Sequence, residues 1–170
     1  MSISKSLRVE LIVLGLTSML GLGLLIAKYR SEHAPKPFSI VGFQVMLPET
    51  VVASKEAKID FDLIYFMLKA QQKRQILFAY VGNYPSFADR SPQGVKEQQS
   101  RIGGQPARTL EWKDKAGRLC RETLVKMAQD NFPVYAHFVY TGLTPAEARM
   151  SDSIIETVRP PDLESDSETE

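Results

Sequence analysis

Residues 11–27 constrain this chain more than any other segment, because they form an apolar run, LIVLGLTSMLGLGLLIA, without a charged side chain. Basic residues flank the run on both sides. A helix rises about 1.5 Å per residue, so the run covers somewhat less than the ~30 Å hydrocarbon core of a bilayer. The flanking basic side chains can reach the headgroups and make up the difference. We therefore expect residues 11–30 to be a transmembrane anchor, with residues 11–27 in contact with the lipid bilayer.

A cleaved signal peptide is the competing interpretation, because it also joins a basic start to an apolar stretch. Cleavage requires small residues one and three positions before the cut. A cut after Ala27 has Leu25 in the third position, and a cut after Ala34 has Glu32 there. The sequence therefore favours an anchor that stays in the mature protein.

The orientation of the anchor is predicted from its place in the chain. Lysine and arginine occur on both sides of the run, so their distribution does not decide the orientation. A short tail before a first span usually stays in the cytoplasm. We expect residues 1–10 to be this cytoplasmic tail and the C-terminal part to lie outside the cytoplasmic membrane, which in a bacterium means the periplasm.

The rest of the chain divides into a linker, one domain and a tail. Residues 31–37 carry prolines and are expected to be a short linker. The chain is 44% hydrophobic and 24% charged, which is typical of globular proteins, and residues 38–160 are long enough for one hydrophobic core. Residues 161–170 are acidic and too polar to pack, so they are expected to be a disordered tail. The formal net charge of +1 does not indicate a nucleic-acid partner.

Apolar runs and alternating patterns predict that most of the domain is antiparallel sheet. Two short strands divided at Gly42 open the domain, and a hairpin and then a meander of three strands follow. The first hairpin strand alternates at its start and then becomes apolar on both faces, as in a strand that runs from an edge into the core. The expected strands are residues 38–41, 43–47, 58–68, 76–81, 105–114, 118–127 and 133–140.

Two helices are predicted in addition to these strands. Residues 91–100 begin with Ser-Pro, which can start a short helix. Thr144 and Glu147 form a capping box, and apolar residues at fourfold spacing follow it up to Pro160. A helix with such an apolar stripe must pack on a sheet. The expected fold class is therefore α+β, an antiparallel β-sheet with helices packed on its faces, preceded by one transmembrane helix.

The domain resembles the PsbP-like α/β sandwich family in the order of its elements and in three segments. These segments are VGFQVMLPE, IGGQPARTLEW and AEARMSDSIIETVRP, which supply a proline-ended strand, a glycine-led strand and an amphipathic last helix. The resemblance covers about residues 38–159 and implies an antiparallel sheet with helices on its faces. It also implies a binding or assembly role without catalysis. It supplies no catalytic residue, and the photosystem role of the plant members is not carried over, because this chain lacks their long insertions.

Few residues of this chain have side chains suited to catalysis or metal binding. The histidines are His33 and His137, and the one cysteine is Cys120, so no zinc or haem ligand set can be assembled at known spacing. We expect neither a metal nor a cofactor. Cys120 and His137 lie on strands that can be neighbours, so a thiolate and imidazole pair is the catalytic arrangement to test. A lone cysteine on a strand is more often a buried packing residue, which favours a protein without catalysis.

A protein partner is the favoured function. Tyr84 and Phe87 lie in an expected loop, where apolar rings are not needed for folding, and exposed aromatic residues commonly anchor a partner. Small residues at fourfold spacing in the apolar run would also permit two anchors to pair as a homodimer. The sequence thus predicts a membrane-anchored accessory or assembly factor. Two alternatives stay open: an envelope enzyme that uses Cys120 with His137, and a carrier for a small apolar ligand between sheet and helix.

Overall fold

The computed structural model describes residues 25–26, 28–29, 31, 34–40, 42–70, 74–83, 85, 94–127 and 135–159. The chain divides between Ala34 and Pro35 into two compact units, and all named strands and the helix α2 belong to the second. The described residues of the first unit up to Ser31 are helical. Among the residues described, no helix is long and apolar enough to cross a membrane. The expected anchor at 11–30, apart from Leu25, Ile26, Lys28 and Tyr29, and the expected tail at 161–170 lie outside the described residues.

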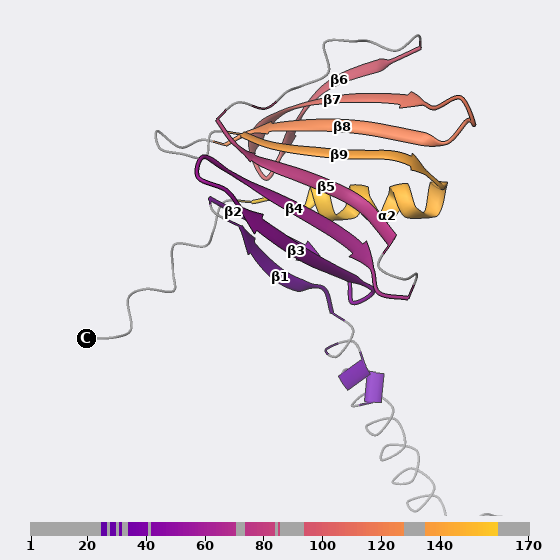
Figure 1. Cartoon of the computed structure of the whole chain (residues 1–170). Coiled ribbons are helices and arrows are strands. Elements are labelled where there is room, and N and C mark those ends of the chain that lie inside the picture. Colours follow the sequence, from indigo (N-terminus) through magenta and orange to yellow (C-terminus); the bar gives the residue numbers. More distant parts are fainter. Residues whose placement is uncertain are drawn as a thin grey trace, which may run out of the picture. The chain divides into compact units, whose positions relative to one another are not determined.

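The described ranges of the second unit form two antiparallel sheets and one helix. The seven-stranded sheet has the order β3-β4-β5-β9-β8-β7-β6, and β1 and β2 form a separate two-stranded sheet. Figure 1 shows that two meanders, β3 to β5 and β6 to β9, meet where β5 lies beside β9. The elements are β1 (Lys36–Ile40), β2 (Phe43–Leu47), β3 (Val51–Ala57), β4 (Phe61–Leu68), β5 (Arg74–Gly82), β6 (Lys96–Ile102), β7 (Gln105–Lys113), β8 (Leu119–Lys126), β9 (Tyr135–Leu143) and α2 (Pro145–Glu156).

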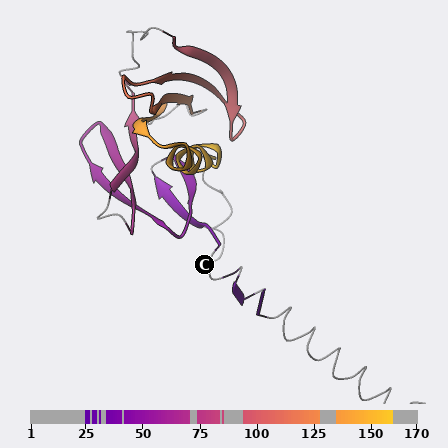
Figure 2. The same ribbon diagram turned by 90° about the vertical axis from the view of Figure 1, so that its right-hand side faces the viewer.

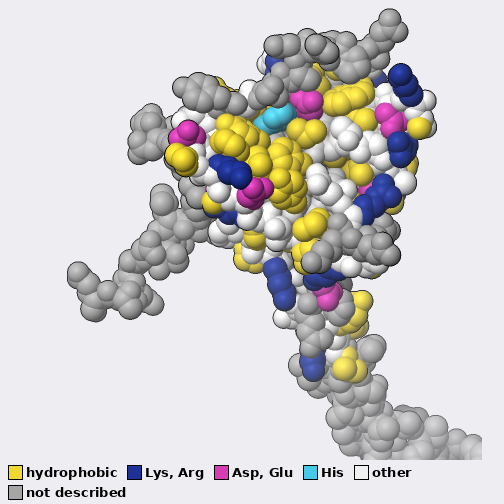
Figure 3. Space-filling view, viewed as in Figure 1, with side chains coloured by type: hydrophobic (Ala, Val, Ile, Leu, Met, Phe, Trp, Pro, Cys, Tyr) yellow, Lys and Arg dark blue, Asp and Glu magenta, His cyan; other side chains and the backbone are white. Residues whose placement is uncertain are grey.

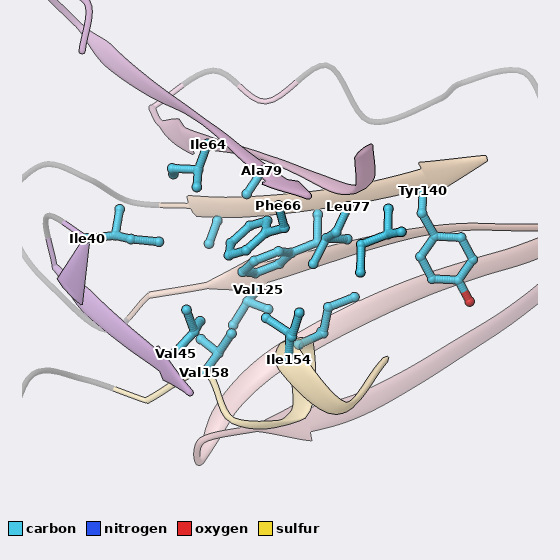
Figure 4. Packing of buried hydrophobic residues seen from close by; sticks show 14 of the residues in the cluster. Ile40, Val45, Ile64, Phe66, Leu77, Ala79, Val125, Tyr140, Ile154 and Val158 are labelled. Atoms are coloured by element: carbon cyan, nitrogen blue, oxygen red, sulfur yellow. The ribbon is translucent and has the colours of Figure 1, made fainter. Parts of the chain in front are cut away.

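The seven-stranded sheet is curved, and α2 lies inside the curve (Figure 2). The β1–β2 hairpin packs on the same inner face, where the ring of Phe43 lies 6.0 Å from that of Phe138 on β9. Figure 4 shows Phe66 of the sheet facing Ile154 of α2 and Val158, which follows the helix, and all three are almost completely buried. The domain therefore has two layers, the large sheet and an inner layer made of α2 and the hairpin.

The structure confirms the predicted terminal helix and its capping box. The Thr144 hydroxyl accepts a hydrogen bond from the Glu147 backbone N–H at 3.4 Å, and the Glu147 carboxylate accepts one from the Thr144 N–H at 2.9 Å. Arg74 of β5 lies 3.1 Å from the same carboxylate. Burial raises the pKa of Glu147, but the hydrogen bonds from Thr144 and the charge of Arg74 outweigh it, so the pKa is lowered. Local signals thus fix both the start of α2 and its attachment to β5.

The expected fold class is wrong in its helices. The domain is mainly antiparallel β-sheet, and in the ranges that the structure describes α2 is the one named helix, on one face of the sheet. The helix expected over 91–100 is instead strand β6 from Lys96 onward. β6 pairs with β7 through the turn Gly103–Gly104, whose two positive φ angles suit a two-residue hairpin. Residues 96–101 are all exposed, so they have no apolar stripe that a helix could bury.

The predicted strands are confirmed, although several begin or end two or three residues from the predicted positions, and one strand besides β6 was missed. Strand β3 was not predicted; it is an edge strand with four exposed residues at its end, and its pairing with β4 holds it in the sheet. Strand β4 begins at Phe61 rather than at residue 58. Ile59 is 100% exposed at the turn between β3 and β4. The turn therefore presents a large apolar side chain to the surroundings.

Candidate functional site

Strands β4 and β5 carry apolar side chains on both of their faces. The inner side chains, such as Phe66 and Val81, are almost fully buried against the inner layer. Six outer side chains are half-buried, and we call them the outer patch: Phe61, Leu63, Tyr65, Met67, Phe78 and Tyr80. In the described part of the chain, α2 and the β1–β2 hairpin both pack on the inner face, so no named element covers the outer patch. The space-filling view shows hydrophobic side chains gathered on this face (Figure 3).

Cross-strand pairing holds the rings of the outer patch in place. Tyr65 lies opposite Phe78 in the β4–β5 ladder, with ring centroids 5.5 Å apart. The rings of Phe61 and Tyr80 lie 5.3 Å apart. A Cβ atom on Gly82 would lie 2.5 Å from the Tyr80 hydroxyl and 2.9 Å from the Phe61 Cβ, so glycine at this position leaves room for the two rings. The patch is therefore an ordered surface.

Charged side chains at the edge of the outer patch are paired with one another. Lys58 contacts Glu56, which lies opposite Leu63 in the β3–β4 ladder. The Tyr65 hydroxyl lies 3.4 Å from a carboxylate oxygen of Glu56. Because these charges compensate each other, the surface beside them is apolar without a strong charge of either sign. Contiguous apolar surface of this kind marks interaction sites in soluble domains.

His137 lies beside the outer patch, opposite Tyr80 on β5 and Leu124 on β8. Its side chain is buried, and Nε2 lies 3.4 Å from a carboxylate oxygen of Glu122. Burial lowers the pKa of His137, and the opposing effect of Glu122 does not restore the ordinary value of 6.5. The histidine visible in Figure 3 is therefore uncharged at neutral pH.

This lowered pKa predicts that acid destabilises the domain through His137. In the unfolded chain the imidazole binds a proton at a higher pH than in the folded chain. The contribution of the neutral His137 to stability is therefore complete above about pH 6.5, and it is lost as the pH falls through the folded pKa. We expect the free energy of unfolding, measured with urea, to fall between about pH 7.5 and about pH 5.5. His137→Gln should flatten this slope, and equal slopes in both proteins would contradict the assignment.

The structure does not bring Cys120 and His137 together. His137 lies opposite Leu124, and Cys120 is four residues further along β8, about 13 Å away at the usual rise of a strand. The Cys120 thiol is buried, and its Sγ accepts a hydrogen bond from the Gly142 backbone N–H at 3.4 Å. The Cys120 thiol is therefore packed in the interior away from His137, and the charged neighbour of His137 is the carboxylate of Glu122.

The predicted partner-binding residues Tyr84 and Phe87 lie outside the described residues. Strand β5 ends at Gly82, which pairs with Phe61. The chain therefore leaves β5 beside the outer patch. The sequence analysis did not predict the patch itself; the signal that could have revealed it is the apolar character of both faces of β4.

A cluster of polar side chains connects α2 with the inner face of the sheet. Arg121 on β8 contacts Glu111 on β7 and lies 2.6 Å from Asp152 on α2. The Tyr140 hydroxyl donates a hydrogen bond to Asp152 at 3.1 Å. Burial raises the pKa of Asp152, with Arg121 opposing this effect, and burial also raises the pKa of Tyr140 far above its usual value. The cluster holds α2 on the sheet through half-buried charges.

The described residues give little support to metal binding or to an apolar cargo. No group of three or more histidine, cysteine, aspartate or glutamate side chains among them could hold a metal ion. The interior between sheet and helix is filled by side chains such as Phe66, Phe138 and Ile154, each 0% exposed. A cavity of about 240 Å³ beside α2 has a mixed lining, with the polar residues Thr109 and Thr123 and the apolar residues Ile102 and Ile155.

Comparison with known proteins adds no relative from which a function could be carried over. No protein-family model matches the chain, and no curated protein shows significant similarity to it. The resemblance to the PsbP-like family therefore stays a prediction, and the functional argument depends on the outer patch.

Proposed function

We propose that this chain is a non-catalytic binding module that binds a protein partner through the outer patch, as an accessory or assembly factor. The observation that carries this proposal is the burial pattern of β4, in which inner residues are buried and outer apolar residues stay half-exposed. Strands that are apolar on both faces are typical of sheets covered on both sides. A partner that covers the outer face would complete this arrangement.

The chemistry of the outer patch suits a protein surface. Phenylalanine and tyrosine are enriched at the centres of protein interfaces, and charged residues are depleted there. Tyr65 and Tyr80 can bury apolar rings and keep a hydroxyl for a hydrogen bond at the edge. The exposed side chain of Ile59 stands at the turn that precedes Phe61, so it extends the apolar surface toward the end of the hairpin.

The proposed setting is the outer side of a cytoplasmic membrane, because residues 11–27 have the composition of an anchor. The short linker would enter the domain at β1, where Lys36 lines a surface hollow together with Val51 and Lys69. Ile59 lies at the other end of β3, about 20 Å further along at the usual rise of a strand. The Ile59 end of the patch therefore lies far from the strand at which the linker joins the domain.

The test compares two arginine substitutions in the full-length chain, one on the outer patch and one on the exposed side of α2. Leu63→Arg places a charge in the patch, and Ser153→Arg is the matched control because Ser153 is exposed on the helix. We expect Leu63→Arg to reduce the amount of partner crosslinked to the chain in its native membranes at least about tenfold, as for the loss of an interface hot spot. Ser153→Arg should leave this amount unchanged.

Thermal unfolding of both variants shows whether the comparison is valid. Both melting temperatures should lie near that of the unchanged chain, because each substitution is on the surface. If Leu63→Arg does not fold, Tyr65→Ala replaces it and carries the same expectation. A folded patch variant that binds its partner as well as the unchanged chain would contradict the proposed function.

A further inference from the structure

Strands β5 and β9 are neighbours at the centre of the sheet, but they pair along only part of their length. Their ladder runs from the pair Gly82–Tyr135 to the pair Phe78–Val139. Beyond Phe78 the two strands diverge, and α2 is visible behind the gap (Figure 1). A cavity of about 290 Å³ lies here, with Ile76 and Leu77 of β5 on one wall and Tyr140 and Thr141 of β9 on the other. We call this cavity the central opening.

Each wall of the central opening contains a β-bulge. The register between β4 and β5 shifts after Phe66, which leaves Ile76 as the extra residue of β5. The register between β8 and β9 shifts around Cys120, where the β9 residues Thr141 and Gly142 stand against one residue of β8. Gly142 has a φ of 67°, a conformation that favours glycine. Bulges on both walls bend β5 and β9 apart and are common beside functional sites.

The helix closes the central opening from the inner side. The Ser151 hydroxyl of α2, fully buried, donates a hydrogen bond to the Ile76 carbonyl oxygen at 2.9 Å. This carbonyl therefore has its partner on the helix and not on β9. On the outer side Phe78 and Val139 are half-buried and Thr141 is exposed, so the opening is reached from the face that carries the outer patch.

We propose that the central opening receives the main chain of a short extended segment of the protein partner. Both walls are strands, and strand backbone outside a ladder pairs readily with an extended peptide. The segment spans about three or four residues, because this is the length over which the two strands are apart. Phe78 belongs both to the wall of the opening and to the outer patch, so one partner can occupy both. This inference rests on the proposed function and adds that the partner binds through an extended peptide segment.

The curvature of the sheet around α2 is the competing explanation of the opening, since bulges also bend a sheet. The two explanations predict different effects on binding when a side chain fills the opening. If the bulges serve curvature alone, a side chain that fills the opening has no effect on binding. If the opening receives a peptide, the same side chain blocks it.

The experiment selects linear peptides of about twelve residues from a displayed library on the full-length chain in nanodiscs. The selected peptides are then measured against Thr141→Trp, which fills the opening, and against Ser153→Trp, which places the same ring on the exposed side of α2. We expect Thr141→Trp to raise the dissociation constant at least about tenfold and Ser153→Trp to leave it unchanged. Bound peptide should also slow the hydrogen exchange of the backbone amides at residues 75–77 and 140–143.

The variant Leu63→Arg separates failure of this inference from failure of the proposed function. Peptides that are sensitive to Leu63→Arg but not to Thr141→Trp would overturn the central opening as a peptide site and leave the outer patch as the binding surface. Peptides sensitive to neither variant would overturn both. Failure to select any peptide, or exchange protection confined to other strands, would also overturn the inference. If Thr141→Trp unfolds the chain, Thr141→Leu is measured in its place. The expected rise in the dissociation constant and the expected protection from hydrogen exchange stay the same.

Discussion

Replacing Phe138 by alanine will lower the free energy of unfolding of the domain by about 3–5 kcal/mol, the usual cost of removing a fully buried aromatic ring. Phe138 is 0% exposed and lies on the central strand β9, on the face that packs against the inner layer. Its ring contacts that of Phe43 on β2. The substitution therefore removes one of the aromatic contacts that join the β1–β2 hairpin to the large sheet. Urea denaturation followed by circular dichroism measures the change.

Tyr135→Ala on the same strand is the matched control for this prediction. Tyr135 is half-buried on the outer side of β9, where no named element among the described residues packs. Its removal should cost about 1 kcal/mol or less. If the two alanine variants were equally stable, the assignment of the inner and outer faces of the sheet would be wrong.

Replacing Arg121 by leucine will destabilise the domain by about 2–3 kcal/mol at neutral pH, somewhat less than the loss of a partner from a fully buried ion pair. The substitution leaves the carboxylates of Glu111 and Asp152 without the cation that lies between them. Asp152 is half-buried, and its pKa is already raised by burial. Loss of Arg121 raises this pKa further, because the charge of Arg121 is the largest effect that opposes burial.

The pH dependence of the Arg121→Leu variant follows from the sign of this shift. A carboxyl with a raised folded pKa binds its proton more readily in the folded chain, so its stabilising effect is present at low pH and is lost as the pH rises through the folded pKa. The deficit of the variant should therefore shrink toward about pH 4. Arg121→Leu combined with Asp152→Asn should recover part of the loss at neutral pH. A double variant as unstable as the single one would contradict the role of the polar cluster.

The parts of the fold that the sequence predicted correctly are those with strong local signals. The capping box of Thr144 and Glu147 determines where α2 begins without any distant contact. The meander of β7, β8 and β9 follows from period-two patterns separated by short turns. These features depend on residues within a few positions of one another, and a pattern can therefore reveal them.

The two errors in secondary structure concern edge strands. β6 is polar along its length, so its strand character depends on pairing with β7 and on the Gly103–Gly104 turn. The local sequence was also compatible with a helix starting at Ser-Pro. Pairing with β7 makes the segment a strand. β3 has few apolar residues and depends in the same way on β4. Edge strands of this kind are determined by tertiary contacts that periodicity does not report.

The candidate site could be predicted only in part. The pattern of β4 showed that both faces are apolar, but it could not show that the inner layer covers one of them only. For this reason the half-exposure of Tyr65, Phe78 and Tyr80 could not be predicted from the sequence. The central opening could not be predicted for another reason. It depends on two register shifts, at Ile76 and Cys120, and these arise only when the strands pair.

Site-specific photocrosslinking tests the role of the outer patch most directly. A photoreactive benzoylphenylalanine is placed at Tyr65 in the outer patch, and in a second protein at Ser153 on the exposed side of α2, and each full-length chain is irradiated in its native membranes. The account predicts a discrete crosslinked protein of one mass from position 65 and none from position 153. Crosslinks from position 153 with none from position 65, or no crosslink from either, would contradict the outer patch as the binding surface.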